Sequence, residues 1–516
     1  MGIKTGDKKM KRGIVQIGKK FDLLALLKVA YMKIRERWVF AGLGGVVFGG
    51  SLFIFDGFGQ PALMISGVAV MVIMLLIVSL GKVLHRNAFL IIVCFGMLFC
   101  LITPVLDTPD ETAHLARAMY LSHGKLFISQ VDSELLISED YELLYDQMQK
   151  TLLENDLNVR DSGVLMVESD GLKATNAYAF ISYLPQALGI GFGRLVNLSV
   201  LWSYYLGRIT NLFFYATMIA LAIRITPLFK EIFLIAGTIP MGVYIASSYN
   251  QDAFGISIIF LTLAIYFRLL NKEDHQIKVT EIVCYIGLCM LITLTKFPFV
   301  LLVLLPAFIP FQKFDKITTY QCVFLGIILT AGFSLAWMKF YTAIPHPFVP
   351  EGVNMIEQVL FLLGDPLANM QMMGLNLFEG LINYLMLFNF GWLSYGSNGL
   401  ALLYLFFYGS ISVFYPKQFK QNVVTRIGAL VVAAGIYVGI ALSMYLTWTP
   451  VGSDVINGVQ GRYFIGFLPL IPLILNIGPS FQQLDQLQIK QYQNIVTLVP
   501  VFFLIMSFTL TLKQYY

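Results

Sequence analysis

The 516-residue chain is strongly apolar: 57% of its residues are hydrophobic, 13% are charged, and its mean hydropathy is +0.74. This composition excludes an ordinary soluble domain and indicates a membrane protein with many spanning segments. The formal net charge of +5 matters chiefly through where the basic residues lie, because Lys and Arg set the orientation of spans.

Apolar runs long enough to cross a bilayer recur along the chain, and a spanning helix needs roughly 20 such residues. They predict an all-α, polytopic membrane fold with about thirteen transmembrane helices. The runs are 38–55, 61–81, 88–106, 199–223, 232–249, 253–270, 281–295, 297–311, 320–340, 399–415, 425–446, 464–478 and 495–512. Two further apolar stretches, 178–196 and 378–395, are broken by polar residues, proline and glycine, so we expect them to lie on the membrane surface or to re-enter it.

The N-terminal segment is basic, with eleven Lys or Arg against three acids in residues 1–37. It predicts a cytoplasmic N-terminus that lies along the inner leaflet as an amphipathic helix, with Phe21, Leu24, Leu27, Tyr31 and Ile34 on one face. Alternation of the spans then places four basic loops on the same side; they are 82–87, 268–278, 311–316 and 416–426. We therefore expect a multi-pass protein of the plasma membrane.

The predicted spans divide the chain into three parts. These are the basic N-terminus 1–37, two transmembrane helices within 38–87, and a membrane domain over 88–512 with external loops 107–177 and 341–398. Loop 107–177 carries fourteen of the thirty Asp and Glu residues, and acids do little to retain a loop inside. All five cysteines lie in or beside apolar runs, so neither a disulfide framework nor a thiolate metal site is predicted.

A polar segment, "LDTPDETAHLARAMYLSHGK" (106–125), directly follows the third apolar run. Thr108, Pro109 and Glu111 have the spacing of a capping box, with Thr at the N-cap, Pro at the first helical position and Glu three residues after the cap. Gly124 is placed to end the same helix, which would have about four turns. Gln also completes a capping box, so Glu111→Gln is expected to be tolerated.

Three ionisable residues fall on one face of this predicted helix. Asp110, His114 and Arg117 follow one another at spacings of four and three residues. Structural explanations are open for Glu111 as a cap, for Asp110 as a favourable charge at a helix N-terminus, and for Arg117 as the partner of an acid. An acid, an imidazole and a guanidinium converging beside lipid are nevertheless costly unless they are used.

At these residues the chain resembles a known family. "TPDETAHLARAMYLSHGK" is similar to the signature of the bacterial predicted membrane proteins grouped as domain of unknown function 2142, and the resemblance extends over most of the chain from about residue 88. It includes "YLPQALGIGFGRLVNLS" (183–199), "SSYNQDAFGISIIFL" (247–261), "TKFPFVLLVLLP" (295–306) and "QGRYFIGFLPL" (460–470). That family is similar in layout to the GT-C glycosyltransferases, which take a sugar from a polyprenyl-phosphate carrier on the outer face of the membrane.

The resemblance implies a GT-C-like membrane glycosyltransferase that acts on a cell-envelope glycan or glycopolymer. The predicted catalytic residues are acids and an imidazole near the mouth of the third span: Asp110, Glu111 and His114. Of the two acids, Asp110 is predicted to be the general base. The predicted substrate-binding residues are charged groups that alternation brings to the same external face: Arg117, Asp252, Lys296 and Arg462.

Structural explanations stay open for three of these residues. Asp252 lies at a predicted hairpin, Lys296 is placed to cap one, and Arg462 beside Tyr463 is placed to anchor a span at the interface. The five histidines show no zinc-ligand spacing, so no metal site is predicted, although a divalent metal held by Asp110 or Glu111 with His114 stays open.

No resident cofactor is predicted; the lipid-linked sugar is a substrate. The expected partners are membrane lipid, a polyprenyl-phosphate sugar, a glycan acceptor and other envelope-polysaccharide enzymes, with no nucleic acid. Two alternatives remain: a transporter or flippase of lipid-linked saccharides, or a non-catalytic partner in envelope polysaccharide assembly.

Overall fold

The computed structural model describes residues 23–54, 67, 70, 83–344, 346–381, 387–416, 422–478 and 485–516. The predicted span 61–81 and most of the predicted amphipathic segment 1–37 lie outside these residues. Helix α2 (Leu23–Ile54) runs without a break across the boundary predicted at residue 37, so the end of the basic segment and the first span form one helix.

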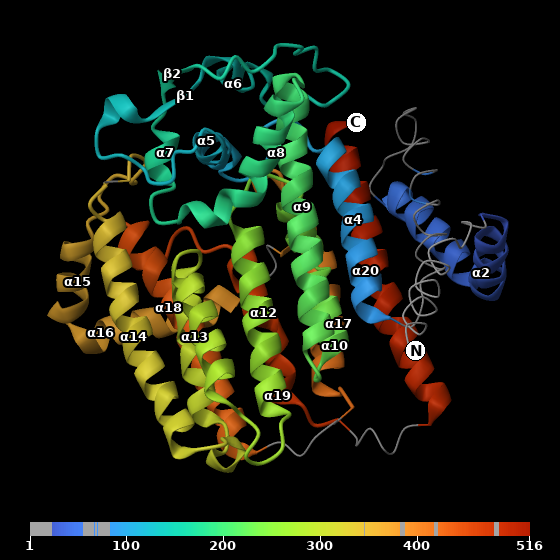
Figure 1. Ribbon diagram of the computed structural model, residues 1–516, viewed down its shortest axis with the longest axis vertical. Helices are drawn as coiled ribbons and strands as arrows, with labels where there is room; N and C mark the ends of the chain where they lie inside the picture. Colours follow the sequence, from blue (N-terminus) through green and yellow to red (C-terminus); the bar gives the residue numbers. More distant parts are fainter. Residues whose placement is uncertain are drawn as a thin grey trace, which may run out of the picture.

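Six helices in the described part of the chain are long and apolar enough to cross a membrane, and they lie side by side in Figure 1. The prediction of a helical membrane protein is thus confirmed, whereas the count of about thirteen spans is not. The six are α4 (Leu84–Ile102), α9 (Val200–Ile225), α12 (Asp252–Leu270), α14 (Ile317–Tyr341), α18 (Val423–Thr447) and α20 (Gln486–Tyr515).

Prolines account for several of the shorter elements. The predicted span 232–249 divides into α10 (Lys230–Gly237) and α11 (Pro240–Ala246), because proline has no N–H to continue the helix. The runs 297–311 and 464–478 contain 3₁₀ turns, η4 (Phe297–Phe308) and η7 (Gly461–Leu470), each with an internal proline, and α19 (Ile471–Leu475) follows η7.

The remaining helices of the membrane part are shorter or amphipathic. They are α13 (Val279–Thr293), η5 (Phe311–Lys313), α15 (Met355–Gly364), α16 (Pro366–Glu379) and α17 (Asn398–Val413). Between α16 and α17, β3 (Asn389–Phe390) and β4 (Tyr395–Gly396) pair as a short antiparallel hairpin. The stretch 378–395 thus ends in this hairpin.

Residues 103–199 form a cap over one end of the helices, at the top of Figure 1. Strands β1 (Leu136–Ser138) and β2 (Leu165–Glu168) pair antiparallel, with Ile137 opposite Val167. The helices of the cap are α5 (Glu111–Ser122), η1 (Asp132–Glu134), α6 (Glu139–Glu142), η2 (Tyr145–Gln147), α7 (Gly171–Ala174), η3 (Phe180–Tyr183) and α8 (Leu184–Leu195).

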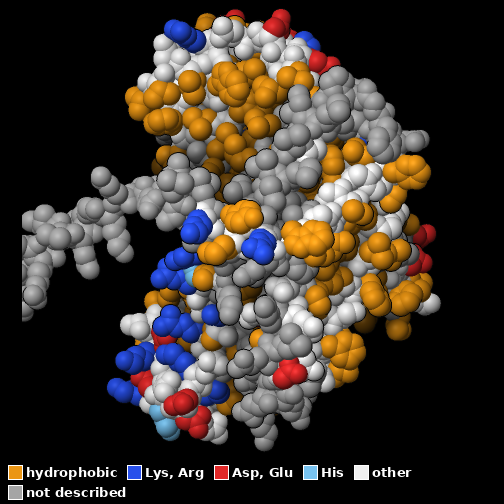
Figure 2. All heavy atoms as spheres, turned by 90° about the vertical axis from the view of Figure 1, so that its right-hand side faces the viewer, with side chains coloured by type: hydrophobic (Ala, Val, Ile, Leu, Met, Phe, Trp, Pro, Cys, Tyr) orange, Lys and Arg blue, Asp and Glu red, His pale blue; other side chains and the backbone are white. Residues whose placement is uncertain are grey.

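The structure has two apolar cores. One lies inside the helix bundle, and the other lies within the cap, including α8, and against the upper end of α9. Helix α12 lies in the interior of the bundle, since 83% of its most apolar 18-residue segment is buried. On the face seen in Figure 2, hydrophobic side chains cover much of the middle, and Lys and Arg side chains gather mainly toward the lower end. This distribution is the one that the positive-inside rule associates with a cytoplasmic lower end.

The orientation is testable with single cysteines in a cysteine-free background. We expect Asn158→Cys, exposed in the cap, to react with an impermeant thiol reagent in intact cells. Glu273→Cys, exposed at the opposite end, should react only after lysis. The reverse pattern would invert the topology.

Candidate functional site

Helix α5 is held to α9 by a fully buried ion pair between Arg208 and Glu111. The guanidinium binds the carboxylate with both arms, Nε to Oε1 at 2.8 Å and Nη2 to Oε2 at 2.7 Å. Its remaining donors bind the backbone carbonyls of residues 100, 103 and 104 at the end of α4. All the charge and hydrogen-bonding capacity of this arginine is therefore used within the protein, which is the condition for burying it at all.

This pairing corrects the predicted capping box. Helix α5 begins at Glu111, and the N-cap position belongs to Asp110, not to Thr108. Glu111 still accepts the backbone N–H of Thr108, at 3.4 Å, but its carboxylate also accepts the N–H of Tyr249 at 3.0 Å and faces Arg208. Tertiary partners thus outweigh the local cap.

The predicted end of the helix is confirmed. Gly124 has φ of +81°, its N–H bonds the carbonyl of Leu121, and the N–H of Lys125 bonds that of Tyr120. These two bonds form a Schellman motif, which needs a residue in the left-handed conformation.

A chain of four charged side chains assembles where α5, α12, η4 and η7 meet. Arg462 donates to Asp110 at 3.2 Å and lies 3.4 Å from the carboxylate of Asp252. Lys296 completes the chain with its ammonium 2.9 Å from the other oxygen of Asp252. Both cations lie over the ring of Tyr463, Lys296 at 4.8 Å and Arg462 at 5.6 Å from its centre. The structure thus brings together four of the seven predicted site residues.

The four charged side chains differ in their exposure to solvent: three are buried and one is accessible. The side chains of Asp252, Lys296 and Arg462 are 1%, 9% and 4% exposed, whereas that of Asp110 is 56% exposed. Asp110 also has φ of 62°, a left-handed conformation that is uncommon outside glycine, asparagine and aspartate. One accessible carboxylate therefore projects from a buried group of one acid and two cations, and it brings the total charge of the four side chains to zero.

Arg462 has a hydrogen-bond donor that no described residue accepts. Its Nη1 atom is buried and has no hydrogen-bond partner among the described residues. The buried Oε1 of Gln460, two residues earlier, also has none there. A buried donor without an acceptor is costly in a folded protein, so each such group at a site calls for an explanation.

His114 lies beside these four charged side chains, but its ring forms a hydrogen bond with Tyr183. Its Nδ1 is 2.9 Å from the hydroxyl of Tyr183, and its ring also faces Tyr178. Burial lowers the pKa of His114 below 6.5, against the opposing effects of Asp110 and Asp252. The imidazole is therefore neutral at pH 7, able to donate or accept one proton in the bond to Tyr183.

Arg117 lies apart from the ion-pair chain. It donates from Nη2 to the carbonyl of Leu126 at 2.6 Å and packs against the rings of Tyr120 and Tyr183. It forms no ion pair with Asp110 in the described residues, since the partner of that carboxylate is Arg462. The spacing along α5 is as predicted, but the start of the helix at Glu111 leaves Asp110 on the turn before it.

Three residues that shape the site were not predicted: Arg208, Tyr463 and Tyr183. Arg208 carried a readable signal, because a charge inside an apolar run is rare and usually paired or functional. The two tyrosines carried none, since aromatic residues are common throughout the chain.

The C-terminal end of α14 and Ile344, shortly after it, are hydrogen-bonded to the cap. Asn176 of the cap donates to the carbonyls of Tyr341 and Ile344, and Trp337 donates to that of Ala177 at 3.3 Å.

No group of three or more His, Cys, Asp or Glu side chains able to hold a metal ion occurs in the described part of the chain.

Comparison with known proteins decides the family. The model of the predicted membrane protein family DUF2142 matches residues 90–474. The chain belongs to this family. No curated protein and no solved structure shows a significant match. The matched range of this DUF2142 chain contains all seven predicted site residues, together with Arg208.

The buried pair makes a contrast between the two neighbouring acids. Glu111→Gln should lower the free energy of unfolding by about 3–5 kcal/mol, because Arg208 is left buried without a counter-charge. Asp110→Asn should cost less, because this side chain is half exposed, Arg462 keeps its pairing with Asp252, and Asn accepts the left-handed backbone. Thermal unfolding of both variants in one detergent measures this; equal stability would contradict the structural role of Glu111.

A second contrast concerns Asp252 and Lys296. Each of the single variants Asp252→Asn and Lys296→Met unbalances a buried charge and should destabilise the protein. The double variant restores neutrality, so its loss should fall short of the sum of the single losses by about 1 kcal/mol or more. Strict additivity in thermal unfolding would show that the two side chains do not interact.

Proposed function

We propose that this protein is a membrane glycosyltransferase that moves a sugar from a polyprenyl-phosphate carrier to a glycan acceptor at the cap end of the bundle. The observation that carries the proposal is the accessible carboxylate of Asp110 bonded to a buried arginine, one of whose donors has no partner among the described residues. GT-C-like layout, the outer face of the plasma membrane and an envelope glycan as acceptor belong to the same proposal.

Transfer to a hydroxyl requires a base that the acceptor can reach. Asp110 is the one acid of the charged chain with substantial exposure, whereas Glu111 is enclosed by Arg208 and backbone N–H groups. Asp110 therefore takes the proton from the acceptor hydroxyl. Glu111 acts as a positioning residue, because it fixes the turn on which Asp110 lies.

The leaving group requires positive charge. As the acceptor oxygen forms a bond to the anomeric carbon, the bond from that carbon to the phosphate oxygen breaks, and the carrier leaves as polyprenyl phosphate. Nη1 of Arg462, which has no hydrogen-bond partner in the described part of the chain, binds a phosphate oxygen, and Lys296 adds a point charge behind it. Preorganised cations of this kind stabilise developing negative charge without rearrangement.

The charged chain also explains how such cations stay in place before the donor arrives. Asp252 lies between Lys296 and Arg462 and offsets part of their charge while the site is empty, which lowers the cost of burying them. Neutral His114, held by its bond to the hydroxyl of Tyr183, adds a polar group beside the charged side chains without adding charge.

The activity test uses purified protein with radiolabelled polyprenyl-phosphate sugars and measures release of label from the lipid. Asp110→Asn should slow transfer by about two to four orders of magnitude, as expected for loss of a general base. The matched control is Asp454→Asn, which removes an exposed acid from the loop before η7 and should leave transfer unchanged. An active Asp110→Asn protein would remove Asp110 from the chemistry.

The clamp is tested with the charge-balanced variant Asp252→Asn with Lys296→Met. It should fold yet transfer at a rate lower by about a hundredfold or more, because the cation is missing when the phosphate leaves. Full activity would restrict Lys296 to a structural role. Wild-type protein that moves labelled lipid between leaflets without consuming it would instead be a flippase, and one that does neither would be a non-catalytic partner.

A further inference from the structure

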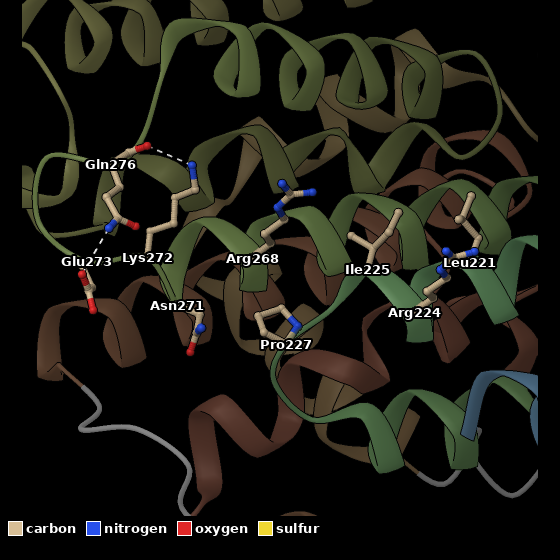
Figure 3. A pocket seen from close by; sticks show the side chains of 9 residues that line it. All are labelled: Leu221, Arg224, Ile225, Pro227, Arg268, Asn271, Lys272, Glu273 and Gln276. Atoms are coloured by element: carbon tan, nitrogen blue, oxygen red, sulfur yellow. Dashed lines mark hydrogen bonds between the residues drawn. The ribbon is translucent and has the colours of Figure 1, made fainter. Parts of the chain in front are cut away.

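A cavity of about 630 Å³ opens at the end of the bundle opposite the cap, between the C-terminal turns of α9 and α12 (Figure 3). Arg268 lies sixteen residues after Asp252 on the same helix, so the cavity is roughly 24 Å from the charged chain. It belongs to neither the proposed site nor the cap. Its lining residues are Leu221, Arg224, Ile225, Pro227, Arg268, Asn271, Lys272, Glu273 and Gln276.

The cavity lining has three cations, Arg224, Arg268 and Lys272, and one described acid, Glu273. Lys272 binds Glu281 at 2.5 Å and the carbonyl of Gln276. Arg224 and Arg268 are exposed, and neither forms a hydrogen bond or an ion pair with another described residue. Among the described residues that line the cavity Glu273 is the single acid, and it accepts a hydrogen bond from Gln276 at 3.2 Å (Figure 3).

Two further cations lie in the region of Arg224, around His85 of α4. Arg86 of α4 and Lys230 of α10 lie close enough to His85 to act on it electrostatically, as Arg224 does. One arginine in the last turn of each helix is explained by the helix dipole. The dipole does not explain why both guanidiniums border one cavity, where they repel one another unless an anion lies between them.

One wall of the cavity is apolar and continues onto the membrane face of α9. Phe213, Thr217 and Leu221 are exposed at spacings of four residues and lead to Arg224. The hydroxyl of Thr217 bonds the carbonyl of Phe213 at 2.7 Å, so this stripe presents no unsatisfied hydroxyl to lipid. Ile225 and Pro227 extend the apolar wall into the cavity.

We propose that this cavity binds the phosphate headgroup of an anionic phospholipid. Arg224 and Arg268 bind its phosphate oxygens as forked donors, and the acyl chains follow the stripe from Leu221 toward Phe213. The cavity is then a lipid site at the basic end of the bundle, where anionic headgroups gather in a cytoplasmic leaflet. It is independent of the proposed sugar transfer.

The test uses the full chain purified in detergent and two lipids, dioleoyl phosphatidylglycerol and dioleoyl phosphatidylcholine. Native mass spectrometry should show phosphatidylglycerol retained on the wild-type protein in preference to phosphatidylcholine, and the same lipid should raise the melting temperature. Arg224→Gln with Arg268→Gln should weaken apparent affinity for phosphatidylglycerol by about thirty-fold, the effect of two interfacial cations.

The matched control is Lys278→Gln with Lys316→Gln, which removes two exposed cations at the same end but outside the lining. It should retain wild-type preference. Equal retention of both lipids, or equal loss of preference in the two double variants, would overturn the proposal. Inorganic phosphate that matches the stabilisation by phosphatidylglycerol would also overturn it, in favour of a soluble phosphorylated ligand.

Discussion

The pair of Arg208 and Glu111 is the interaction on which the cap end of the molecule depends. It joins α9 to the first turn of α5, and through three carbonyls it fixes the chain that leaves α4. Glu111 also receives the N–H of Tyr249, so the segment before α12 is tied to the same carboxylate. One buried charge pair thus positions three segments that are far apart in the sequence.

The position of Asp110 follows from this constraint. With Glu111 fixed, its neighbour is held on a left-handed turn outside the helix, where Arg462 meets it. A surface carboxylate on a flexible loop would gain little from an ion pair. Here the partner is buried and braced by Asp252, Lys296 and Tyr463, so one end of the pair is rigid and the other is open to water. Such an arrangement suits a group that must meet a substrate in a fixed geometry.

The two ends of α12 have contrasting electrostatics. At its N-terminus, the buried carboxylate of Asp252 is paired with two cations, Lys296 and Arg462. At its C-terminus, Arg268 borders a cavity in which cations exceed acids. Sixteen residues of helix separate Asp252 from Arg268, so the two ends lie roughly 24 Å apart. The chemistry proposed at the cap and the lipid site proposed at the other end can therefore be altered separately by mutation.

Some properties of this protein follow from the sequence alone. Apolar runs establish a helical membrane protein, Gly124 marks the end of α5, and the charged residues between runs indicate a shared face. Each depends on composition or on contacts within a few residues, which the local chain determines. The number of continuous spans was less accessible, because prolines in apolar runs shorten some helices and rewind others as 3₁₀ turns.

Tertiary structure decided which charged residues meet. Nothing within the segment 106–125 distinguishes a Glu111 that caps its own helix from one that binds Arg208, since 97 residues separate the two partners. The same holds for Asp110 and Arg462, which are 352 residues apart, and for the separation of Arg117 from that pair. A buried charge must find a counter-charge wherever the fold provides one, and that choice depends on the packing of whole helices rather than on local spacing.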